Sequence, residues 1–94
     1  MADVTERGFR IDRFNDAYGV ECSLQESSIA ADEGHVWFGC SAPNAKILMP
    51  GGWVDHDLSE DVQVTTRMHL SQSQMRELLP ALQHFAEHGV LPSA

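Results

Sequence analysis

The sequence has few basic residues: six Lys and Arg stand against fourteen Asp and Glu, for a net charge of −8 at pH 7. Proteins that bind nucleic acid directly neutralise phosphates with Lys and Arg, so this deficit argues against nucleic acid as a direct partner. No apolar run approaches the roughly 20 residues that a membrane-spanning helix needs. The first residues also lack the apolar segment of a signal peptide. We therefore expect a cytoplasmic protein without a membrane partner.

Cysteine is also scarce, with only Cys22 and Cys40, and no C-x-x-C pair is present. Both lie on the alternating apolar positions of expected strands, where a free thiol behaves as a small hydrophobic side chain. A disulfide would require the two Cα atoms to lie within about 7 Å, which the sequence does not establish. Core thiols are the favoured interpretation, and a disulfide or a metal site assembled from scattered ligands stays open.

The 94 residues are 43% hydrophobic and 21% charged, which is typical of one globular domain. We expect a flexible N-terminus over residues 1–7 and a single domain over residues 8–94. The charge is unevenly distributed, because residues 14–66 hold nine acidic residues and only Lys46. That segment therefore carries the whole net charge, which either keeps the protein soluble or attracts a basic partner.

The C-terminal part of the chain predicts a helix over residues 72–88. An apolar stripe follows the helical spacing at Met75, Leu78, Leu79, Leu82, Phe85 and Ala86. Ser71 and Gln74 match a capping box, and Gly89 suits the left-handed residue that ends a helix. Pro80 should bend the helix without ending it, because the stripe continues in phase beyond it.

The preceding residues read as strands separated by turns. Apolar residues alternate with others over 20–24 and 36–40, and shorter patterns begin at Phe9, at Ile47 and at Val62. Short connections favour antiparallel neighbours. We expect an α+β fold: an antiparallel meander of four or five strands with the C-terminal helix packed on one face. Trp37 is out of phase with its neighbours and should lie on the opposite face of the sheet.

Two segments superficially match metal-binding motifs. The string from His84 to His88 has the H-x-x-E-H form of a zinc-protease motif, but it falls in the last helical turn beside Gly89. The loop over residues 55–61 is acidic, but it lacks the Gly and the bidentate Glu of a calcium loop. We expect no catalytic residue, no metal site and no cofactor. A small metal-dependent enzyme using His84, Glu87 and His88 is the remote alternative.

The favoured binding residues surround Trp53, because Trp is over-represented among binding hot spots. Trp53 and Trp37 could form an apolar patch with an acidic rim. The candidate partner-binding residues are Trp53, Asp55, Asp57, Glu60 and Asp61. This composition predicts contact with a protein that has a basic surface or groove, and it leaves open whether the chain forms a homodimer.

Four strings resemble a group of short, acidic, mostly uncharacterised phage and prophage proteins. They are Tyr18-Gly19 with residues 22–28 (CSLQESS), 36–39 (VWFG), 66–70 (TRMHL) and 78–82 (LLPAL). The resemblance implies no role for individual residues, but it implies a setting in the host cytoplasm. Small phage proteins often disable a host machine, so we expect a non-catalytic accessory protein, such as an anti-CRISPR-type or other anti-defence inhibitor. A phage housekeeping or virion-assembly module is the alternative.

Overall fold

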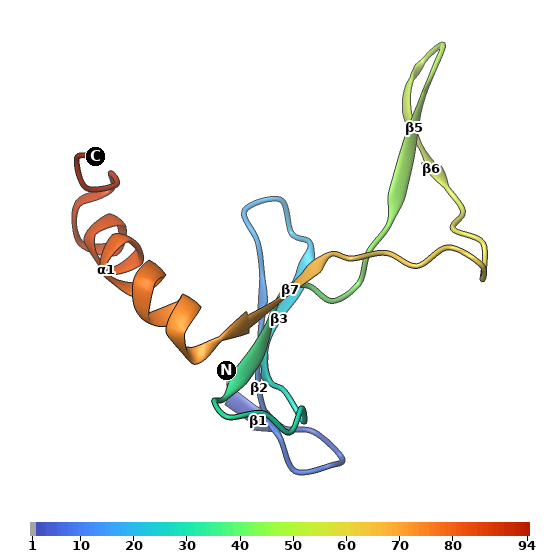
Figure 1. Cartoon of the computed structure of the whole chain (residues 1–94). Coiled ribbons are helices and arrows are strands. Elements are labelled where there is room, and N and C mark those ends of the chain that lie inside the picture. Colours follow the sequence, from blue (N-terminus) through green and yellow to red (C-terminus); the bar gives the residue numbers. More distant parts are fainter. Residues whose placement is uncertain (1) are drawn as a thin grey trace.

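The computed structural model describes residues 2–94 and has an α+β fold, which confirms the expected fold class (Figure 1). Five antiparallel strands form one sheet in the order β1-β2-β3-β4-β7, and β5 and β6 form a separate two-stranded sheet. The elements are β1 (Ala2–Val4), β2 (Arg10–Asn15), β3 (Glu21–Glu26), β4 (His35–Cys40), β5 (Ala45–Met49), β6 (Gly52–His56), β7 (Arg67–Ser71) and α1 (Gln72–His88).

The register of the large sheet gives it one apolar and one polar face. Phe14 lies opposite Cys22, and Leu24 lies opposite Phe38. Because side chains alternate across a strand, the face that we call the apolar face carries Phe14, Cys22, Leu24, Val36, Phe38, Cys40, Met68 and Leu70. The charged residues in the same phase are Arg10, Asp12 and Glu26. Trp37 pairs with Gln25 and His69, so it lies on the opposite, polar face, as its phase predicted.

The N-terminal residues that we expected to be flexible include a strand of this sheet. β1 pairs with β2 from Ala2 opposite Asp12 to Val4 opposite Arg10. A side-chain ion pair of 3.1 Å joins Asp3 to Arg13 across the two strands. The sheet therefore begins at the second residue.

The expected fourth and fifth strands are placed differently. Residues 47–49 do not join the large sheet, because β5 pairs with β6, a strand that was not predicted and whose last two residues were expected in the acidic loop. The last strand of the large sheet is β7, and residues 62–66 lead into it without strand structure. β4 therefore pairs with β7, and the β5–β6 hairpin interrupts the chain between them.

β4 and β7 approach closely at Gly39, where β4 has a φ of 145°. A side chain at this position would overlap the backbone carbonyl of Thr66. Thr66 in turn accepts a hydrogen bond from the Cys40 N–H (3.2 Å), and its hydroxyl donates to the Cys40 carbonyl (2.9 Å). Glycine is required here both for its backbone conformation and for its small size.

The helix α1 spans the residues that its sequence predicts. Ser71 is the N-cap and accepts a hydrogen bond from the Gln74 N–H, while the Gln74 side chain accepts one from the Ser71 N–H, so the capping box is present. At the other end Gly89 is left-handed and its N–H donates to the Phe85 carbonyl. Pro80 lies inside the helix and does not end it.

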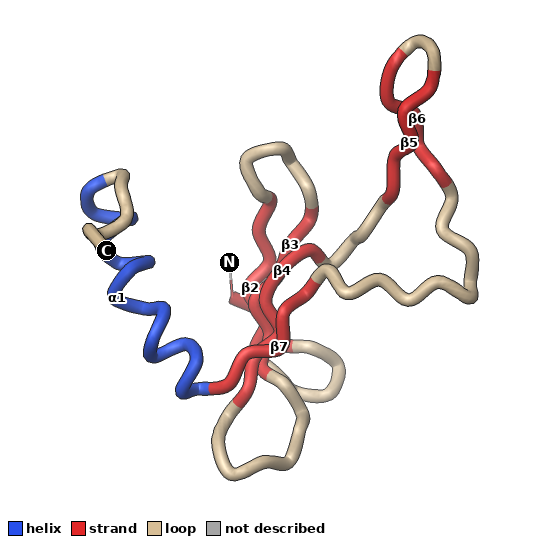
Figure 2. The backbone as a smooth tube through the Cα atoms, turned by 45° about the horizontal axis from the view of Figure 1, so that its top comes forward, coloured by secondary structure: helices blue, strands red, loops and turns tan. Residues whose placement is uncertain are grey.

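The expected packing of α1 across the sheet is not found within the chain. Among the described helices and strands, β7 is the one element with which α1 makes several contacts. The helix begins beside the sheet, with Met75 near Val36 and Leu70, and then runs away from the strands (Figure 2). Its later apolar residues are exposed: Leu78, Leu79, Leu82 and Phe85. The physical reason is that α1 starts at the last residue of β7 without a linker, and hydrogen bonds from Gln72 and Ser73 to residues 33 and 34 fix the direction of its first turn.

The single chain consequently has a very small core. Within residues 2–94 the buried hydrophobic residues are Ile11 and Cys22, accompanied by Ser23. Cys22 and Cys40 lie directly opposite each other on β3 and β4, and both are free thiols. Burial is the main cause that raises the pKa of the Cys22 thiol, which keeps it protonated and unreactive.

Candidate functional site

The most exposed apolar element is the β5–β6 hairpin, which projects away from the large sheet (Figure 1). Its register places Leu48 opposite Trp53 on one face and Ile47 opposite Val54 on the other. Trp53 is 66% exposed and Leu48 is 63% exposed, and Ile47 and Val54 are also exposed. An isolated two-stranded hairpin is at best marginally stable in water. This element therefore gains from a partner that covers it.

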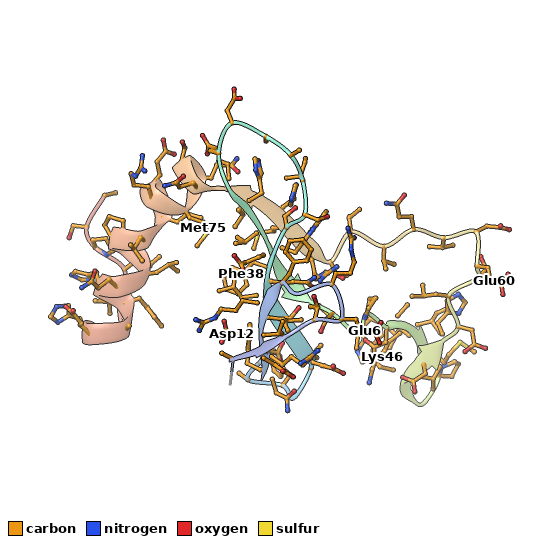
Figure 3. The ribbon with its side chains drawn as sticks, turned by 90° about the horizontal axis from the view of Figure 1, so that it is seen from below. Glu6, Asp12, Phe38, Lys46, Glu60 and Met75 are labelled. Atoms are coloured by element: carbon orange, nitrogen blue, oxygen red, sulfur yellow. The ribbon has the colours of Figure 1, made fainter. Side chains whose placement is uncertain are left out.

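The acidic residues that the sequence singled out belong to the same projection. Asp55 lies in β6 opposite Lys46, with 3.9 Å between the Lys46 Nζ and an Asp55 carboxylate oxygen, and both side chains are well exposed. Asp57, Glu60 and Asp61 follow directly and are exposed. We call residues 45–61 the arm. Figure 3 shows Lys46 and Glu60 on the arm, on the other side of the sheet residues Phe38 and Asp12 from Met75.

The structure separates the two tryptophans that we expected in one patch. Trp37 lies on β4 in the large sheet, whereas Trp53 lies on β6 in the projecting hairpin. Trp53 and Asp55 both lie on β6, the other three acids follow in the next loop, and Trp37 takes part in a different cluster. The prediction of a shared patch was wrong because sequence spacing does not show that residues 45–56 form a sheet of their own.

Trp37 is the centre of an aromatic cluster on the polar face. The His69 ring stacks on Trp37 with 4.0 Å between ring centroids, and His35 stacks on His69 at 4.9 Å. The Arg67 guanidinium lies 5.4 Å from the centroid of the Trp37 ring, in a cation–π contact, and donates to the Gln25 side chain at 3.1 Å. The His69 Nε2 lies 2.9 Å from the Ser27 hydroxyl.

Sequence reasoning missed this cluster, although a signal was available. His35 and Trp37 alternate with apolar residues along β4, and Arg67 and His69 do the same along β7. Their common phase places all four side chains on one face once β4 and β7 are paired. The pairing itself joins residues about 30 positions apart, and the alternation within each strand does not reveal it.

An open cavity of about 520 Å³ lies beside the cluster, between Arg13, Ser23, Trp37 and Arg67, with residues 63–66 at its rim. Ser23 is fully buried there, and its hydroxyl has no hydrogen-bond partner among residues 2–94. The volume lies within the range of small-molecule sites. However, Arg13 is already paired with Asp3 and Arg67 with Gln25. The cavity therefore offers the Trp37 ring for stacking, but its two arginines already have partners within the chain.

The H-x-x-E-H string places its two histidines on one side of the end of α1. The rings of His84 and His88 are 4.6 Å apart, and the His84 Nδ1 lies 2.9 Å from the Val90 carbonyl. This contact ties the helix end to the following residues. In the part of the chain that the structure describes, no three His, Cys, Asp or Glu side chains form a group that could hold a metal ion.

These features define a small α+β protein with an open antiparallel sheet, a projecting acidic arm and an exposed C-terminal helix. In comparisons with known proteins, the chain matches no family model, no curated protein and no solved structure. None of the helices within residues 2–94 combines the length and the apolar character that crossing a membrane requires.

Proposed function

We propose that this chain is a non-catalytic binding protein whose arm docks on a basic surface or groove of a partner protein. The observation that carries the proposal is the exposure of Trp53 and Leu48 on a projecting hairpin that continues directly into Asp55, Asp57, Glu60 and Asp61. A large aromatic side chain with a polar rim is the usual composition of a binding hot spot.

The charge distribution supports the same mode of binding. The arm holds four acidic residues and the single Lys46, so it has a net charge of −3. Acidic rim residues steer a basic partner toward the arm and raise the association rate, while a central aromatic residue slows dissociation. The acidic residues of the arm would therefore act on the association rate, and Trp53 on the dissociation rate.

The resemblance to phage and prophage proteins suggests the setting. In that setting the partner is a host protein that binds nucleic acid through Lys and Arg, such as a guided defence complex, which an acidic arm can occupy in place of the nucleic acid. The protein would then act as an anti-CRISPR-type or other anti-defence inhibitor in the host cytoplasm.

The test compares proteins retained from host lysate by three forms of the chain. In the arm variant, Asp55, Asp57, Glu60 and Asp61 are changed to Lys. In the control variant, the same change is made at four exposed acids outside the arm: Glu6, Asp32, Glu77 and Glu87. Both variants have the same net charge, so a difference between them reports where the charge lies.

We expect the wild type and the control to retain the same partner and the arm variant to lose it. Salt and heparin should displace that partner, because exposed charges are screened beyond about 8 Å at physiological ionic strength and heparin competes for basic grooves. Trp53→Ala should weaken binding by roughly 30-fold, as expected for a central anchor worth about 2 kcal/mol. Equal retention by the arm variant and the wild type would refute the proposal.

A further inference from the structure

The single chain exposes far more surface than a compact protein of its mass. Its accessible surface is 7769 Å², whereas a compact monomer of 10.4 kDa exposes about 5,400 Å². The surplus is roughly 2,400 Å² per chain. The radius of gyration is 16.5 Å, against about 12.4 Å for a compact domain of this length and about 16 Å for one of twice the length.

Two apolar surfaces contribute to this surplus, and they do not cover each other. One is the stripe of α1, defined by Leu78, Leu79, Leu82 and Phe85, whose side chains are 45% to 56% exposed. The other is the apolar face of the sheet, where Phe14 and Met68 are also exposed. Phe14 and Phe38 already contact each other there, with 6.1 Å between ring centroids in an edge-to-face arrangement.

Hydrogen bonds at the start of α1 direct the helix away from its own sheet. Ser71 is both the last residue of β7 and the N-cap of the helix, so no linker separates the two elements. The Gln72 N–H donates to the Gly34 carbonyl at 2.9 Å. The N–H and hydroxyl of Ser73 donate to the Glu33 carboxylate at 2.8 and 3.0 Å. These bonds fix the first turn, and the stripe beyond Met75 cannot fold back without breaking them.

We propose that the missing cover is a second copy of the chain. In a two-fold dimer, the α1 stripe of each copy packs on the apolar face of the other. Both helix stripes and both apolar sheet faces are then covered in one symmetric interface. Two-fold symmetry makes this exchange self-complementary and closed, which explains how a chain with such surfaces avoids open-ended association.

The area is sufficient for this interface. A standard protein–protein interface buries about 800 Å² on each partner, and obligate dimers bury about 1,000–2,500 Å² per partner. The surplus of roughly 2,400 Å² per chain is as large as the area that each partner of an obligate dimer buries. Even if the arm accounts for two thirds of the surplus, the remaining third matches the area of a standard interface.

The charge distribution favours a second copy over a basic partner at this surface. Residues 67–94 have no net charge, because Arg67 and Arg76 balance Glu77 and Glu87. The helix of one copy can therefore approach the sheet of the other without like-charge repulsion, whereas the arms, each with a net charge of −3, repel each other. The dimer accordingly leaves the arms outside the interface, and this inference does not depend on the proposed function.

The first test measures mass and affinity by sedimentation of the full chain. We expect a species of twice 10.4 kDa at micromolar concentration. Leu82→Ala keeps a good helix former but removes an apolar contact from both copies, so the dissociation constant should rise at least ~100-fold. Gln83→Ala, next to it on the helix but outside the stripe, should change that constant by less than ~3-fold. A monomeric wild type, or equal effects of the two variants, would overturn the proposal.

The second test locates the contact without any substitution. Isotope-filtered NOE spectra of a mixture of labelled and unlabelled chains report only contacts between copies. We expect signals between the methyl groups of Leu78 or Leu82 and the rings of Phe14 or Phe38. A dimer whose signals join helix to helix only, or arm to arm, would refute the exchange even though the chain is dimeric.

Discussion

Replacing Gly39 with alanine tests the closest approach between β4 and β7. Gly39 has a φ of 145°, a backbone conformation that residues other than glycine rarely adopt. Strain of this kind costs about 1–3 kcal/mol. The added methyl group would also meet the Thr66 carbonyl, so the backbone of Thr66 must move.

That movement would lengthen or break the two hydrogen bonds between Thr66 and Cys40, of 3.2 and 2.9 Å. Each contributes about 1 kcal/mol to stability. Strain and lost bonds together predict that Gly39→Ala lowers the free energy of unfolding by about 3–5 kcal/mol. For a domain of this size, 1 kcal/mol shifts the melting temperature by about 4–8 °C, so we expect a fall of at least ~12 °C.

Thermal unfolding followed by circular dichroism at one fixed protein concentration measures this shift. Gly51→Ala is the matched control, because an added Cβ there meets nothing within 4 Å and the φ of Gly51 is not positive. It should change the melting temperature by less than ~4 °C. If Gly39→Ala melts as the wild type does, the described pairing of β4 with β7 at this point is wrong.

Three further predictions follow from individual side chains. The N–H of Ser73 is the main cause that lowers the pKa of Glu33 below its ordinary value of 4.5, so the stabilisation by its carboxylate is present above pH 4.5 and is lost as the pH falls through the lower folded-state pKa. Glu33→Gln should therefore lower the melting temperature at pH 7, and the difference from the wild type should shrink as the pH falls below 4.5; an unchanged difference would contradict the assignment. A thiol reagent should label the half-exposed Cys40 of the native protein well before the buried Cys22, as peptide mapping of the labelled protein can show; equal labelling rates would show that Cys22 is not protected. Chelation should leave the melting temperature unchanged, whereas loss of a structural Zn²⁺ would remove on the order of 10 kcal/mol and give a large fall.

The helix was predictable to the residue because its signals are local. The capping box of Ser71 and Gln74, the left-handed Gly89 and the apolar stripe all lie within about one helix length of each other. The strands β2, β3 and β4 were found from alternation for the same reason, and the opposite phase of Trp37 correctly placed it on the polar face.

The remaining features depend on contacts between distant residues. Alternation shows that residues 45–49 form a strand, but it does not show that their partner is 52–56 instead of the large sheet. The direction of α1 depends on Glu33, about 40 positions before the helix residue that it binds. The acidic residues and Trp53 of the candidate site were identified because they are neighbours in sequence, whereas the cluster of Trp37, His69 and Arg67 was missed because β4 and β7 are not.

The position of the arm in the strand order has a consequence for how this protein can change. β4 and β7 are adjacent antiparallel partners, with Gly39 opposite Arg67, so the ends of the connecting segment lie next to each other. A tight turn would suffice to join such strands, and everything from residue 41 to residue 66 is therefore an insertion into an otherwise ordinary hairpin. Insertions of this kind can become longer or shorter, or change in sequence, with little loss of stability, since each doubling of a flexible loop's length costs only about 0.6 kcal/mol. The sheet and helix can thus stay constant as a scaffold while residues 41–66 vary, and under the proposed function a graft of this segment would carry the binding specificity with it.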